Sequence, residues 1–175
     1  DWYFCACCPP NIMRTFASLE ATIASTAGRE VQLAQYTRAR VETIVGESPV
    51  VIDVDTDYPA EGVVRVTVIE GAGDATLALR LPGWCRRWQV EVDGEIVEAV
   101  AAEGWIRLSG ALTSGTVVVL HLDLTPDLLR GNARIDAIRG AVAVRRGPVV
   151  YCAEQADNAV DVELAGLSPA GGVVV

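Results

Sequence analysis

Three cysteines near the start of the sequence are the residues best suited to chemistry. Cys5, Cys7 and Cys8 fall within four positions, directly before Pro9 and Pro10. The thiolate is the nucleophilic and metal-binding form of cysteine, and a helix N-terminus or a bound cation favours it. We therefore consider a thiol nucleophile or a tetrahedral metal site in which Cys7 and Cys8 supply two ligands. The alternative is that all three are small apolar side chains buried beneath a helix.

The segment after the cysteines predicts how they are positioned. An apolar residue recurs there at steps of four, three and four, at Ile12, Phe16, Leu19 and Ile23. This spacing predicts a helix over residues 11–26. Because proline is tolerated in the first turn of a helix, the proline pair places the helix start directly behind the cysteines.

The remaining candidate residues offer less chemistry. His121 is the only histidine, and on a predicted strand it shares a face with Asp123, so we interpret it as an outward-facing or rim residue. Trp84, Trp88 and Trp105 could form a platform on which a sugar stacks, but buried packing of large rings is the commoner role. The acidic residues are scattered, and no two of them stand out as the paired carboxylates of a glycosidase.

Composition excludes several classes of protein. All 14 basic residues are arginine, which excludes a Schiff-base lysine and the lysine of a phosphate-binding loop. A net charge of −9 and a pI of about 4.6 would repel a phosphate backbone, so we expect no nucleic-acid partner. No apolar run approaches the roughly 20 residues that cross a bilayer, so we expect a soluble protein with no membrane partner.

The chain ends and the cysteine count give two further expectations. The first residue is Asp1 and the last three are valines, so we expect a piece of a longer protein. Five cysteines are an odd number, and three of them stand too close together for good disulfide geometry. We therefore expect a reducing compartment such as the cytoplasm.

From Glu30 onward the apolar period changes to two, which predicts a mainly β chain. Turn signals separate the strand-like runs, and Asp93-Gly94 between two of them predicts a two-residue hairpin. Short strands at this spacing predict an antiparallel β-sandwich preceded by one N-terminal helix. We expect strands at residues 31–36, 50–54, 64–68, 76–81, 89–92, 95–97, 105–108, 116–124, 141–145 and 149–153.

The cysteine motif resembles that of glycoside hydrolase family 127, the β-L-arabinofuranosidase family. The resemblance is carried by CACCPPN at residues 5–11 and RTFASL at residues 14–19. Further segments resemble the β-sandwich region of the family in the expected order: DTDYP at 55–59, LRLPGWC at 79–85 and RRGPVVYCAE at 145–154. The resemblance implies that residues 1–28 end an (α/α)6 barrel and that residues 29–175 form a β-sandwich domain.

The resemblance also implies an activity. In that family a zinc-bound cysteine is the nucleophile of a retaining hydrolysis, and by motif position Cys7 is the nucleophile and Cys8 a second zinc ligand, with Cys5 less certainly placed. The implied substrate is a carbohydrate of the L-arabinofuranoside type. The acid/base residue and the remaining zinc ligands come from the barrel upstream of the motif, so we expect the isolated chain to be inactive and to hold zinc weakly.

Two other readings of the sequence remain open. One is a noncatalytic sandwich domain that supports the barrel or binds glycan, in which case Trp84, Trp88 or Trp105 should be exposed together. The other is a thiol-based metal or redox module, which thiol titration with and without zinc would reveal.

Overall fold

The computed structural model describes residues 7–159, 161–162, 166–167 and 173–174. The chain divides into two compact units, Asp1–Leu124 and Thr125–Val175, and each is described here by itself. In the part of the chain so described, no helix is both long enough and apolar enough to cross a membrane.

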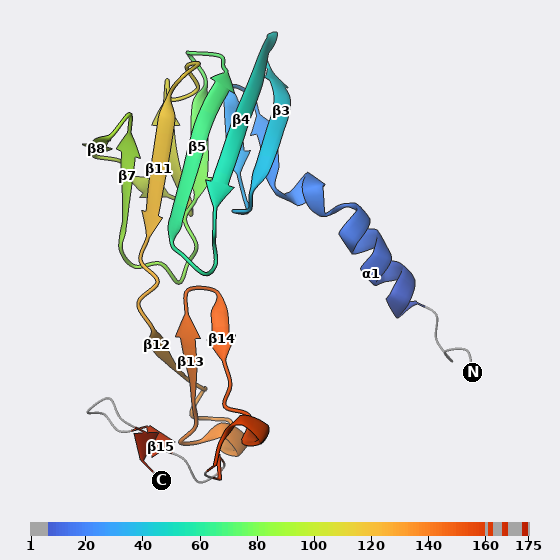
Figure 1. The fold of residues 1–175 in the computed structure, drawn as a ribbon, viewed down its shortest axis with the longest axis vertical. Coiled ribbons are helices and arrows are strands. Elements are labelled where there is room, and N and C mark those ends of the chain that lie inside the picture. The colour runs from blue at the N-terminus through green and yellow to red at the C-terminus, as the bar shows by residue number, and fades with distance from the viewer. Residues whose placement is uncertain (1–6, 160, 163–165, 168–172, 175) are drawn as a thin grey trace. The chain divides into compact units, whose positions relative to one another are not determined.

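The first unit contains two sheets that enclose one core, which confirms the predicted mainly β sandwich with one helix at the N-terminus (Figure 1). The helix is α1 (Cys8–Ala17), and a short 3-10 helix, η1 (Leu19–Thr22), follows it. The five-stranded sheet has the order β1-β2-β6-β10-β9: β1 Ala24–Ala27, β2 Glu30–Leu33, β6 Thr76–Arg80, β10 Trp105–Ser109 and β9 Ala101–Ala102. The six-stranded sheet has the order β3-β4-β5-β11-β7-β8: β3 Ala39–Val45, β4 Ser48–Thr56, β5 Val63–Glu70, β11 Val117–Leu122, β7 Trp88–Val92 and β8 Glu95–Val97.

The core follows from the period-two pattern of the strands. On β5, Val64, Val66 and Val68 point inward and are at most 1% exposed. On the neighbouring β11, Leu120 is 0% exposed and pairs with Val64. Because each such side chain stabilises the fold by about 1.5–3 kcal/mol relative to an exposed position, this alternation fixes which face of each strand points inward.

The hairpin between β7 and β8 closes with a pair of left-handed residues. The predicted Asp93-Gly94 turn joins β7 to β8, and its two residues have φ values of 52° and 86°. This is the positive-φ pair that a two-residue hairpin of matching twist needs. Asp93 adds a further support, since its carboxylate accepts a hydrogen bond from the Val117 amide at 2.8 Å.

The predicted helix over residues 11–26 is too long. The structure ends α1 at Ala17, where the Ser18 hydroxyl donates to the Arg14 carbonyl at 2.9 Å and competes with the helical pattern. The apolar period continues through η1, but Ala24–Ala27 forms β1 and pairs with β2. Strand pairing therefore overrides the helical period beyond Thr22.

The sandwich also contains a parallel pair that the sequence analysis did not predict. Strands β2 and β6 run parallel, with Glu30 opposite Thr76 and Leu33 opposite Leu79. The pairing joins residues more than forty positions apart, so it depends on the topology of the whole unit. In the described part of this unit the other strand pairs are antiparallel, as predicted.

The second unit has a small antiparallel sheet of its own. Its order is β12-β13-β14, and Asp127 on β12 pairs with Arg145 on β13 through an ion pair of 3.2 Å. The predicted strands at 141–145 and 149–153 correspond to two of its members. The elements of this unit are β12 Asp127–Arg130, η2 Asp136–Ile138, β13 Val142–Arg146, β14 Val149–Tyr151, η3 Gln155–Asp157, β15 Gly166–Leu167 and β16 Val173–Val174.

Candidate active site

Cys7 and Cys8 lie together at the N-terminus of α1. Cys7 is the N-cap residue directly before α1, and its carbonyl accepts a hydrogen bond from the Asn11 amide at 3.2 Å. The two Sγ atoms are 3.6 Å apart, and both residues are exposed. They are therefore not buried beneath the helix, which was the alternative interpretation of the cluster.

The separation of the two sulfurs suits a shared zinc ion. Two thiolates on a tetrahedral zinc, each with a bond of about 2.3 Å, lie about 3.8 Å from one another. The Cys7–Cys8 distance of 3.6 Å is close to this value. In the described residues no group of three or more His, Cys, Asp or Glu side chains could hold a metal ion, and Cys5 lies outside those residues. Two thiols alone are too few donors for a tetrahedral zinc site, which needs four.

The helix that carries these thiols has an exposed apolar face. On α1, Ile12, Met13 and Phe16 are 56%, 70% and 72% exposed, and Leu19 on η1 is 46% exposed. None of the residues of α1 is buried. A helix whose apolar face meets no core gains little from packing, and within the described residues η1 connects α1 to the sandwich.

That segment lies beside the loop that joins β2 to β3, residues 34–38. Tyr36 anchors the loop inside the unit, where it is 7% exposed and its hydroxyl donates to the Arg80 carbonyl at 2.6 Å. The ring of Tyr36 meets that of Tyr58 edge to face at 5.8 Å, and Tyr58 stacks on Trp84 at 6.5 Å. Three connections of the sandwich are thereby joined by aromatic contacts.

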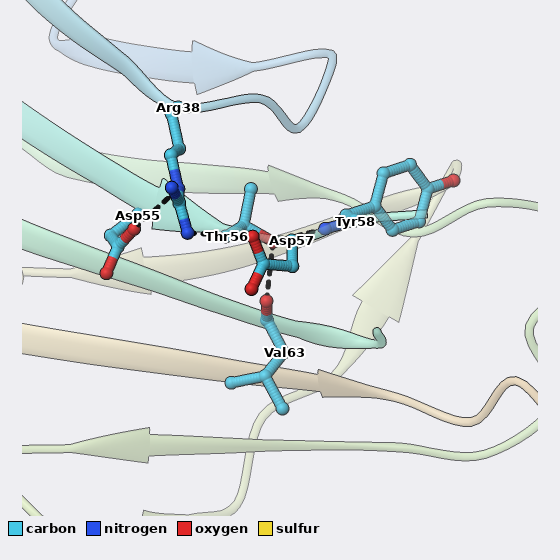
Figure 2. A network of polar contacts seen from close by, with 6 residues as sticks. All are labelled: Arg38, Asp55, Thr56, Asp57, Tyr58 and Val63. Atoms are coloured by element: carbon cyan, nitrogen blue, oxygen red, sulfur yellow. Dashed lines mark hydrogen bonds and ion pairs between the residues drawn. The ribbon is translucent and has the colours of Figure 1, made fainter. Parts of the chain in front are cut away.

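Arg38 anchors the other end of the loop to β4, as Figure 2 shows. Its guanidinium contacts Asp55 at 3.1 Å and donates to Asp57 at 2.7 Å. Between these carboxylates, Thr56 closes the β4–β5 connection, since its hydroxyl donates to the Val63 carbonyl at 2.6 Å and accepts a hydrogen bond from the Tyr58 amide at 3.0 Å. Exposed ion pairs stabilise a fold only weakly, so the main role of Arg38 is to fix where the loop lies.

The other predicted candidates have packing roles. Trp84 and Trp88 are half-buried against the core, and Trp105 is half-buried with the Arg80 guanidinium 5.5 Å from its ring centre. They do not form a shared exposed platform. His121 faces outward, as predicted, with its Nε2 atom 3.0 Å from the carboxylate of Glu91.

The aromatic contacts give a prediction for alkaline pH. Burial raises the pKa of Tyr36 well above its ordinary value, and the nearby Tyr58 adds to the shift. The unfolded phenol ionises near pH 10, so the stabilisation from the neutral Tyr36 is complete below that pH and is lost as the pH rises above it. The chain has no lysine, and burial also raises the pKa of Tyr58 and of Cys85, which adds to the same loss of stability. We expect urea unfolding midpoints to fall above about pH 10.

The Tyr36→Phe variant tests whether Tyr36 causes the fall of the urea midpoint at high pH. It should be less stable than the wild type at pH 8, because the hydrogen bond to the Arg80 carbonyl is lost, but its midpoint should fall less steeply above pH 10. Tyr151 is 51% exposed, so Tyr151→Phe should retain the wild-type profile. Equal profiles in all three proteins would contradict the assignment to Tyr36.

Comparison with known proteins agrees with this architecture. Residues 30–124 match the middle domain of the family described as beta-L-arabinofuranosidase, GH127, and residues 126–171 match the glycoside hydrolase family 127 C-terminal domain. The two matched ranges divide almost where the two units of the structure divide.

Individual relatives extend the comparison. The non-reducing end beta-L-arabinofuranosidase of Bifidobacterium longum is 34% identical over 168 residues, which cover 92% of this chain and 25% of the relative. A solved GH127 beta-arabinofuranosidase superimposes with a TM-score of 0.90 at 32% identity, over 95% of this chain and 29% of that one. The GH127 beta-L-arabinofuranosidase of Geobacillus stearothermophilus gives a TM-score of 0.88 at 34% identity, over 95% and 27%. This chain thus spans about a quarter of the relatives' length, and it belongs to glycoside hydrolase family 127.

Proposed function

We propose that this chain is part of a longer retaining glycoside hydrolase that cleaves L-arabinofuranosides with Cys7 as its nucleophile. The observation that carries the proposal is the pair of thiols at the N-terminus of α1, with sulfurs 3.6 Å apart, in a chain of this family. The relatives named as beta-L-arabinofuranosidases supply the substrate class. The remaining length of the relatives leaves room for the acid/base residue and for a helical barrel that covers the exposed face of α1.

The proposed reaction has two displacements at the anomeric carbon. In the first, the Cys7 sulfur attacks that carbon, a carbon–sulfur bond forms, and the bond to the leaving-group oxygen breaks while an acid outside this chain protonates that oxygen. In the second, the same group removes a proton from water, the water oxygen attacks the carbon, and the sulfur leaves with its electron pair. Two inversions retain the configuration.

The thiol pair is suited to zinc as well as to attack. Held by Cys7 and Cys8, zinc would supply a positive charge that keeps the thiols ionised and makes the sulfur a better leaving group. In this arrangement Cys8 would bind the zinc ion but would not contact the sugar carbon. The remaining ligands lie outside the described residues, since those residues offer no third donor beside the pair.

We expect the 175-residue chain alone to have no appreciable hydrolase activity and to retain less than one zinc per chain after dialysis. It has two of four zinc ligands and lacks a proposed acid/base. An aryl β-L-arabinofuranoside assay and a metal analysis measure both quantities, with the intact protein prepared in parallel. Robust turnover by the isolated chain would contradict the proposal that part of the active site lies outside it. An inactive intact protein would contradict the proposed function itself.

A further inference from the structure

The segment between α1 and the sandwich is held by a small set of hydrogen bonds. The Ile23 carbonyl accepts the amides of Ala34 and Gln35 at 2.9 and 3.2 Å. The Gln35 side-chain amide donates to the Thr22 hydroxyl at 2.9 Å, and that hydroxyl donates in turn to the Leu19 carbonyl at 2.6 Å. The Thr22 hydroxyl therefore links the β2–β3 loop to the backbone of η1.

The loop side of this link is fixed. Gln35 is adjacent to Tyr36, which is buried and bonded to the Arg80 carbonyl, and Arg38 holds the loop to β4. On the helix side, no residue of α1 is buried within this chain, and the chain bends at Ser18. In the described residues, the hydrogen bonds at Thr22 and Ile23 are thus the fixed point from which α1 projects.

We propose that Gln35 and Thr22 are positioning residues for Cys7. The inference rests on the proposed function, because it gives the sandwich a role in placing the nucleophile. Helix α1 has ten residues, so it is about 15 Å long, and a rotation of about 5° at its base moves its far end by about 1 Å. A displacement of about 1 Å in a reacting group can lower a rate about a hundredfold.

Substitution of Thr22 in the intact protein tests the proposal. Thr22→Val has nearly the same volume but cannot accept from Gln35 or donate to Leu19. We expect kcat for an aryl β-L-arabinofuranoside to fall about tenfold, because other parts of the intact protein also hold α1. KM should stay within about twofold, since the substrate pocket is not altered. Thr22→Ser retains the hydroxyl and should restore kcat to within about twofold of wild type.

Two further comparisons separate positioning from a general loss of stability. Gln35→Ala should resemble Thr22→Val, and the double variant should be no slower than either, because both remove one interaction. Ser25→Ala is the matched control: its hydroxyl donates to Gln32 at 3.2 Å within the sheet and does not contact η1. It should leave kcat unchanged.

Hydrogen exchange gives a readout that does not depend on activity. Thr22→Val should speed amide exchange in residues 11–17, whereas Thr22→Ser and Ser25→Ala should not. If Thr22→Val had the kcat and the amide exchange rates of the wild type, the positioning role would be overturned. The assignment of the nucleophile would remain intact. Equal losses of kcat in Thr22→Ser and Thr22→Val would also overturn it. A wild-type intact protein without turnover would instead contradict the proposed function, and the exchange data would still report on the link.

Discussion

In the intact protein, Cys7→Ser is expected to lower turnover by on the order of a thousandfold or more, because a serine hydroxyl does not ionise near neutral pH. The change replaces one atom, sulfur by oxygen, in an exposed residue at the N-terminus of α1. The substrate should therefore still bind. Steady-state kinetics on an aryl β-L-arabinofuranoside measure the loss, and isothermal titration with L-arabinose measures the binding that remains.

Two other cysteines provide the comparison. Cys152 is exposed in the second unit, and Cys152→Ser should leave turnover unchanged. Cys8→Ser should lower zinc content together with activity, since it removes a proposed ligand and not the attacking sulfur. If Cys7→Ser retained a near-normal rate while Cys8→Ser lost it, the nucleophile would have to be reassigned.

The strands were predictable because their side chains obey a local rule. Inward valines alternate with more exposed residues along β5, so period two alone indicates this strand and its buried face. The Asp93-Gly94 hairpin was predictable for the same reason, since two adjacent residues determine its backbone geometry. Where the outcome depended on a distant partner the prediction was wrong, as for Ala24–Ala27, which forms a strand only because β2 lies beside it.

The candidate site likewise has one part that local spacing predicted and another part that it did not. Cys7 and Cys8 are neighbours in sequence, so their joint position followed from local spacing. The contact between Gln35 and Thr22 joins residues 13 positions apart across a bend and a turn, and the Tyr36–Tyr58–Trp84 contacts join three separate connections. Neither the hydrogen bond nor the aromatic contacts produce a periodic pattern in the sequence. Tyr58 and Trp84 do stand in two of the segments that resemble the family, residues 55–59 and 79–85.

The largest expected effect on stability is at Gly71, where two loops of the sandwich unit meet. A Cβ atom added there would lie 1.9 Å from the carbonyl oxygen of Leu112 and 2.9 Å from a methyl group of Val68. Real atoms do not approach so closely, and Leu112 is 0% exposed in the loop between β10 and β11. The backbone of one loop must therefore move, and the hydrogen bond from the Gly115 amide to the Val68 carbonyl, 2.8 Å long, joins the same two segments.

We therefore expect Gly71→Ala to destabilise the sandwich unit by roughly 3 kcal/mol, which lowers Tm by about 10 °C for a unit of this size. Gly83 is the matched control, because a Cβ there meets nothing within 4 Å and its φ is not in the left-handed region. Gly83→Ala should be neutral or slightly stabilising, since it restricts only the unfolded chain. Tryptophan fluorescence during thermal unfolding reports this unit, which contains Trp84, Trp88 and Trp105. Equal Tm values for the two variants would mean that the loops at Gly71 yield without loss of core contacts, and the tight packing inferred between them would be wrong.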